Sequence, residues 1–174
     1  MKKILALVLA AILALVAVSA LAEESKVNED ISDASTNLEG VTMEKAEDTD
    51  ETTAIKEALK EAQKNGDVLA GLPEEIRNQI PEGRAVINEM DTYQLEGYTG
   101  QTADKIILTF KFETPYEEGE DVTVLFAITA AEKETEWLVR DGKGNAEGAV
   151  EVEVTEEQFV KLTENPFVVI PVSA

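Results

Sequence analysis

Regular alternation of apolar and polar residues in the second half of the chain constrains the fold more than any other feature. In residues 105–112, apolar side chains occupy every second position and end with Phe110 and Phe112. The same period of two recurs in residues 122–129 and 150–154. This is the period of a β-strand with one buried face. Six strands are expected, in residues 84–95, 105–112, 122–129, 135–140, 150–154 and 167–172.

These strands are joined mostly by short turns, which favours an antiparallel β-sandwich of immunoglobulin-like type within a mainly β fold. A short N-terminal helical region is expected in residues 53–64 and 73–80, with Thr52 or Thr53 as the cap of the first helix. A capping box at Thr155 predicts one more short helix before the last strand. The alternative is an α+β fold, in which a curved antiparallel sheet packs on the N-terminal helix.

Residues 1–22 have the organisation of a secretory signal peptide. Lys2 and Lys3 precede an unbroken apolar run in residues 4–18, and small residues suitable for cleavage follow in residues 20–22. We expect cleavage after one of the two alanines there, and hence a secreted, extracellular protein. In the alternative, the segment stays uncut and anchors the protein to the membrane by its N-terminus.

The remaining chain divides by composition at about residue 51. Residues 23–51 are rich in acids and show no apolar period of 3.6 or 2. Low hydrophobicity combined with like charge predicts a disordered acidic linker. Residues 52–174 are long enough for a single globular domain.

The chain contains neither cysteine nor histidine. Thiol nucleophiles, serine–histidine pairs and the usual zinc sites are therefore excluded. An exported domain without disulfides is more typical of bacteria than of animal secretions. The composition thus predicts a bacterial protein of the cell envelope or secretome that is not an enzyme.

The charge is strongly acidic, with 36 Asp and Glu against 15 Lys and Arg and a formal net charge of −21. Such a surface repels the phosphates of nucleic acids and of anionic lipids. We therefore expect no nucleic-acid partner, and no membrane contact after cleavage of the signal. The expected partner is an extracellular protein or a glycan.

Two acidic segments are candidate metal sites, although no cofactor is expected other than calcium. One is a crowded turn, and the other resembles the opening of a calcium-binding loop but has Lys143 where an oxygen ligand is needed. In both segments an ordinary solvated turn is the alternative. The candidate ligands are Glu117, Glu118, Glu120, Asp121, Asp141 and Asn145.

Three aromatic residues are candidate ligand-binding residues, namely Tyr98, Tyr116 and Trp137. If they shared one exposed face, their rings would form a platform on which a sugar stacks. The alternative is that Trp137 belongs to the core and that the tyrosines are scattered over turns.

The sequence as a whole favours an exported, non-enzymatic binding or structural module. One alternative is a glycan-processing enzyme that uses carboxylates, or a calcium-binding domain. Another is an inhibitor or partner subunit that recognises a cationic protein surface. An apolar spot surrounded by acidic residues would favour a protein partner.

Overall fold

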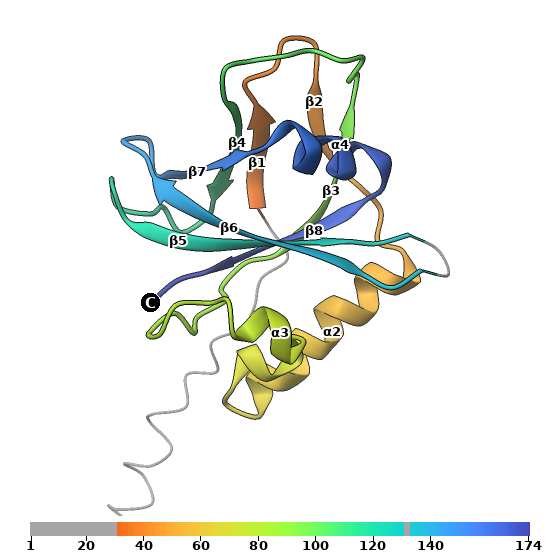
Figure 1. The fold of residues 1–174 in the computed structure, drawn as a ribbon. Coiled ribbons are helices and arrows are strands. Elements are labelled where there is room, and N and C mark those ends of the chain that lie inside the picture. Colours follow the sequence, from red (N-terminus) through yellow and green to blue (C-terminus); the bar gives the residue numbers. More distant parts are fainter. Residues whose placement is uncertain (1–30, 131–132) are drawn as a thin grey trace, which may run out of the picture.

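The computed structural model of the protein describes residues 31–130 and 133–174, and Figure 1 shows its elements. The predicted signal peptide and residues 23–30 of the predicted linker lie outside these ranges. The strands are β1 (Ile31–Thr36), β2 (Thr42–Lys45), β3 (Asp91–Glu96), β4 (Ile106–Phe112), β5 (Asp121–Ile128), β6 (Glu136–Gly144), β7 (Ala149–Val154) and β8 (Phe167–Val172). The helices are α2 (Asp50–Lys64), the 3-10 helix η1 (Val68–Gly71), α3 (Glu74–Arg77) and α4 (Glu156–Glu164).

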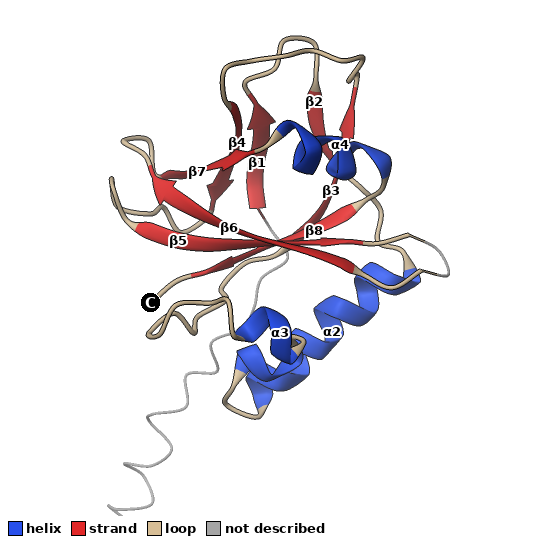
Figure 2. Cartoon of the chain, in the orientation of Figure 1, coloured by secondary structure: helices blue, strands red, loops and turns tan. Residues whose placement is uncertain are grey.

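All eight strands belong to one antiparallel sheet, in the order β1-β4-β7-β6-β5-β8-β3-β2. The sheet curls until its two edge strands, β1 and β2, approach each other, so it is nearly a barrel (Figure 2). The predicted mainly β, antiparallel class is confirmed. The strands enclose an apolar core as in a sandwich, and they also form a curved sheet that carries the N-terminal helix.

The inside of the curled sheet holds the main core. Phe110 of β4 and Phe126 of β5 are not on neighbouring strands, yet their ring centroids lie 6.0 Å apart. Helix α4 lies against this core and inserts Phe159 and Leu162, both fully buried. Each aromatic side chain that loses contact with water here stabilises the fold by about 1.5–3 kcal/mol.

A second apolar layer lies on the outside of the sheet. Leu125 and Ala127 of β5 point away from the main core and pack in one cluster with Leu59 of α2. The coverage of both faces leaves β5 buried along nearly its whole length, as expected for a central strand. In Figure 1, α2 and α3 lie on the opposite side of β5 and β8 from α4. No helix in residues 31–130 or 133–174 has the length and apolar character needed to cross a bilayer.

The prediction that residues 23–51 form a disordered linker is wrong for residues 31–51. This segment contributes both edge strands and the start of α2. Most of its acids lie on exposed positions, while Ile31 and Met43 are buried in the core. A bulge between Ile31 and Asp33 interrupts the alternation of β1, and β2 is only four residues long. Neither strand therefore produces a recognisable period in the sequence.

Three local predictions also need correction. Helix α2 starts earlier than predicted, because Thr49 is its cap and Thr52 is the reciprocal member of the capping box. The predicted strand 84–95 is confined to β3, preceded by an isolated bridge between Val86 and Ser173. The glycine-rich pattern of residues 141–148 predicts a hairpin loop, but residues 141–144 form the second half of β6 and only residues 145–148 form the turn.

The glycines in β6 allow close packing, not a turn. A Cβ atom on Gly144 would lie 2.1 Å from the carbonyl oxygen of Glu117, and one on Gly142 would lie 2.8 Å from a methyl group of Val150. These positions therefore need glycine because another segment lies directly against the backbone.

Candidate functional site

The acidic turn that is a candidate metal site is held together by hydrogen bonds within the turn. The Glu117 amide donates to the Glu120 carboxylate at 2.9 Å. Asp121 lies on β5, where its carboxylate is 3.6 Å from Lys143 Nζ. Glu118 is exposed on the same turn. The acids of this segment therefore have contacts within the turn and across β5 and β6, or are exposed to solvent, as in an ordinary solvated turn.

Asp141 and Asn145, the other metal candidates, have different contacts. The Asp141 side chain is 93% exposed and lies 3.9 Å from the Arg84 guanidinium. Asn145 closes the turn between β6 and β7, because its Oδ1 accepts hydrogen bonds at 3.0 Å from the amides of Glu147 and Ala149. Within the described ranges, no group of three or more acidic residues is arranged to hold a metal ion.

The three aromatic candidates do not share a face. Tyr98 packs edge-on against Phe159, and Tyr116 packs edge-on against Phe112, each with ring centroids 5.2 Å apart. Both tyrosines therefore border the main core. Trp137 belongs to the second apolar layer, on the outside of the sheet. The structure does not bring these residues together as a sugar platform.

The ionisation of Tyr116 is strongly perturbed. Burial raises its pKa to about 12, and the nearby carboxylates of Glu89 and Glu120 act in the same direction. A hydrogen bond with Ser173 opposes this rise. The phenol is therefore neutral over the physiological range.

Buried charged groups that the sequence did not reveal serve to hold elements together. Lys56 of α2 is 4% exposed and binds Asp48, which precedes the helix, and lies 3.8 Å from Asp91 of β3. Glu89, 2% exposed, accepts hydrogen bonds at 3.0 Å from the amides of Glu113 and Thr114. Each buried carboxylate thus has partners from another segment, as a folded protein requires.

Three surface hollows, in contrast, meet at the first half of β6. The first, the α2–β6 groove, has a volume of about 620 Å³. Its apolar lining residues, here called the floor, are Ala54, Ile55, Ala58, Ile76 and Trp137. Its acidic lining residues, here called the rim, are Glu51, Glu75 and Glu134. The groove is therefore an apolar surface with carboxylates around it.

The second, the α4–β6 hollow, lies on the other side of the strand and measures about 640 Å³. Glu136 of β6 faces the acidic helix α4 across it, and Lys161 of α4 forms an ion pair with Glu136 at 2.5 Å. Glu156, Glu157 and Glu164 supply further carboxylates. The pKa of Lys161 is raised by its hydrogen bond and ion pair with Glu136.

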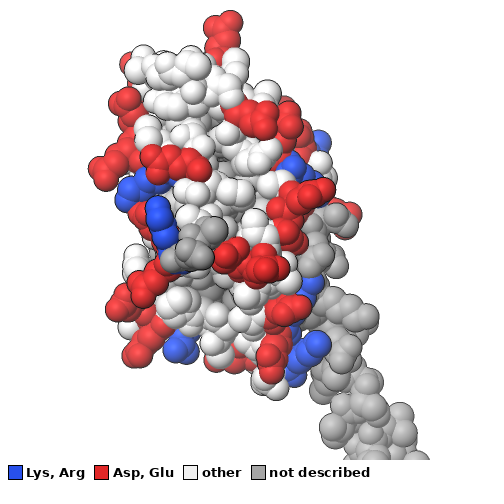
Figure 3. Space-filling model, turned by 90° about the vertical axis from the view of Figure 1, so that its right-hand side faces the viewer, with Lys and Arg blue, Asp and Glu red and all other residues white. Residues whose placement is uncertain are grey.

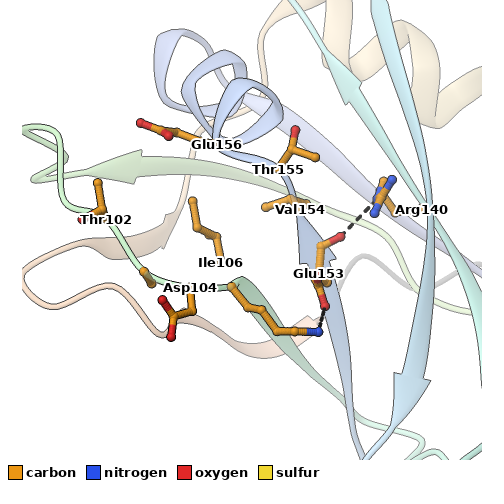
Figure 4. A pocket seen from close by; sticks show the side chains of 10 residues that line it. Thr102, Asp104, Ile106, Arg140, Glu153, Val154, Thr155 and Glu156 are labelled. Atoms are coloured by element: carbon orange, nitrogen blue, oxygen red, sulfur yellow. Dashed lines mark hydrogen bonds and ion pairs between the residues drawn. The ribbon is translucent and has the colours of Figure 1, made fainter.

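The third, the β4–β6 pocket, measures about 300 Å³ and is shown in Figure 4. It opens where β6 and β7 separate. The Arg140 Nε donates to the backbone oxygen of Glu153 at 3.1 Å, and the Glu153 carboxylate lies 2.6 Å from Lys105 Nζ. Both basic groups at this pocket are therefore already engaged by β7.

Acidic groups dominate this region of the surface. The three hollows together are lined by nine carboxylates and only three basic side chains. The view in Figure 3 shows the same imbalance, with acidic residues scattered around uncharged surface. Low-dielectric walls between like charges concentrate a negative potential, which attracts cationic ligands.

No family model, curated protein or solved structure matches the chain. The hollows offer apolar side chains and carboxylates, and the chain has no cysteine or histidine to add to them. Sequence reasoning singled out Trp137 but not the glutamates around it, since these come from α2, α3 and the chain before β6.

Proposed function

We propose that the protein is an exported, non-enzymatic binding module that recognises a basic, partly apolar segment of another extracellular protein. The observation that carries this proposal is the α2–β6 groove, where Trp137 lies on an apolar floor and glutamates form the rim. Tryptophan is one of the residues enriched among those that contribute most of the binding energy at protein interfaces. Rim carboxylates guide a cationic partner and select against an acidic one.

A protein partner fits these observations better than a glycan does. Sugar binding by stacking uses aromatic rings presented together, whereas Tyr98 and Tyr116 pack on the main core and Trp137 lies outside the sheet. The buried carboxylates Glu89 and Asp91 have backbone or ion-pair partners and line none of the three hollows. They therefore give no support to an acid–base pair acting on a glycosidic bond.

The tryptophan itself supplies the test, because Trp137 is the only one in the chain. The probe is a 12-residue peptide of alternating leucine and lysine, titrated into the protein without its signal while tryptophan emission is recorded. We expect saturable binding with a shift of the emission to shorter wavelength. Matched peptides with glutamate in place of lysine, or serine in place of leucine, should give no saturable change.

Two charge-matched variants locate the site. The triple substitution Glu51→Gln, Glu75→Gln and Glu134→Gln should weaken binding by about tenfold, since each rim charge contributes roughly 0.5 kcal/mol. The control replaces Glu39, Glu118 and Glu147, which are exposed and line none of the three hollows. Equal weakening in both variants, or no binding of the leucine–lysine peptide, would contradict the proposal.

A further inference from the structure

Strand β6 is hydrogen-bonded along its whole length on one side only. On that side it pairs with β5 from Glu136 to Lys143. On the other side it pairs with β7 only through Gly142, Lys143 and Gly144. In the described part of the chain, no strand pairs with the outer edge of β6 between Glu136 and Asp141. The sheet is thus split at this point.

The split is crossed by side chains alone. Arg140 reaches from β6 to the backbone oxygen of Glu153, and Lys161 reaches from α4 to Glu136. Residues 137–140 are only partly buried, whereas the neighbouring β5 is buried on nearly every residue. An exposed edge with unpaired backbone groups is a template for one more strand.

We propose that an extended segment of the partner protein adds to the free edge of β6 as an antiparallel or parallel strand, with alternating apolar and basic side chains. This inference rests on the proposed function and specifies how the same surface binds. The backbone of the segment pairs with Glu136–Asp141, which corresponds to a strand of about five or six residues. Main-chain hydrogen bonds then provide affinity, and pockets for alternate side chains provide specificity.

The alternation follows from the two hollows that flank the strand. Glu136 lines the acidic α4–β6 hollow, while the next residue, Trp137, lines the apolar α2–β6 groove. Consecutive residues of a strand point to opposite faces, so the two hollows lie on opposite faces of β6. A strand added beside β6 would direct its own side chains alternately into the same two hollows. One set must be apolar and the other basic.

The acidic charge of the hollows favours a different protein, and not a second copy of this chain, as the source of the added strand. Two copies paired edge to edge would bring together two sets of hollows in which carboxylates outnumber basic groups nine to three. The three basic groups, Lys105, Arg140 and Lys161, already have partners within the chain. Like charges at an interface oppose association, whereas a basic strand neutralises them.

Backbone methylation of the probe tests the inference. In an added strand, only every second amide of the peptide donates to β6. We therefore compare two forms of the leucine–lysine peptide, N-methylated on the leucines or on the lysines. One form should lose at least tenfold in affinity for the protein while the other binds within about threefold of the parent peptide. Amide hydrogen exchange should slow in residues 136–141 when the parent peptide is bound.

A variant of the protein provides a second, independent test. Arg140→Ala removes the side chain that crosses the split and should tighten peptide binding by about threefold or more. Lys143→Ala is the control, because it removes one positive charge from the same strand beyond the free edge. Equal effects of the two substitutions would contradict the inference.

The outcomes separate the two proposals. If the parent peptide binds with the expected dependence on the rim glutamates but both methylated forms bind equally well, strand addition is overturned and the proposed function stands. If no peptide binds, both are overturned. If residues 136–141 become protected with rising protein concentration and without peptide, a second copy occupies the edge and the inference is wrong.

Discussion

The ammonium group of Lys56 lies 2.8 Å and 2.9 Å from the two carboxylate oxygens of Asp48, with only 5% of the lysine side chain exposed. Asp48 in turn accepts hydrogen bonds from Thr52 and from Thr92, which is on β3. This contact therefore ties the first turns of α2 to the chain before it and to the sheet. The arrangement positions α2, which forms one wall of the α2–β6 groove.

Lys56→Met should lower the free energy of unfolding by about 1–2 kcal/mol, less than for a fully buried ion pair because the Asp48 side chain is 35% exposed. The reason is that Asp48 loses its cation, whereas Asp91 keeps its closer ion pair with Lys45 at 2.6 Å. Lys64→Met, at the exposed end of the same helix, is the control and should change stability by less than about 0.5 kcal/mol. Urea unfolding measures both. A Lys56→Met protein as stable as wild type would show that the pair is energetically neutral.

Acid should weaken the same contact. Burial of the Asp48 carboxyl raises its pKa, but hydrogen bonds from Lys56 and Thr92 outweigh this, so the pKa lies below its ordinary value of 3.8. The unfolded chain therefore takes up this proton first as the pH falls, and the contribution to stability is lost below about pH 4. We expect the stability difference between wild type and Asp48→Asn to shrink from pH 6 to pH 2. A difference that is constant over this range would contradict the assignment.

Removal of the edge strands should unfold the domain. A chain that begins at Thr52 lacks β1 and β2 and with them the buried side chains of Ile31 and Met43. We expect it to show no cooperative thermal transition by circular dichroism and to bind a hydrophobic dye. A chain that begins at residue 23 should melt cooperatively. Similar melting of the two chains would mean that the strands of residues 31–45 are dispensable.

Gly144→Ala should destabilise the protein by roughly 1–3 kcal/mol, the usual cost of excess volume at a packed position. The new Cβ atom would lie 2.1 Å from the carbonyl oxygen of Glu117, so β6 and the turn before β5 must separate. Lys143→Ala is the matched control, since Lys143 is exposed on the same strand. The denaturant midpoints of the two variants measure the difference in stability. Equal midpoints would show that the turn before β5 can move away from β6 without a loss of stability.

The parts of the fold that sequence reasoning predicted well share strict local signals. The alternation in β4 predicts its inner face, and the capping box at Thr155 and Gln158 predicts the start of α4. These signals depend only on neighbours within one element. The bulged β1 and the four-residue β2 have no such signal, because their partners are residues at least 48 positions away.

Of the residues that line the α2–β6 groove, only Trp137 could be predicted from the sequence. Trp137 stood out as a lone large aromatic, but its neighbours Ile55 and Ile76 come from α2 and α3. The pairing of β6 shows the same dependence on distant segments. The period of β6 predicts a strand. Nothing in residues 136–141, however, indicates that β7 pairs with β6 only from Gly142 to Gly144.

The sequence by itself determined the mainly β class, most of the strands and helix α4, because side-chain period and helix capping are local properties of the chain. It also determined the acidic charge and the absence of thiol and imidazole chemistry. Only the tertiary structure decided that residues 31–51 belong to the domain, that the glycines of β6 serve packing, and that one edge of β6 lies open between an apolar groove and an acidic hollow. These features depend on which distant segments meet, and that outcome is set by the packing of the whole core.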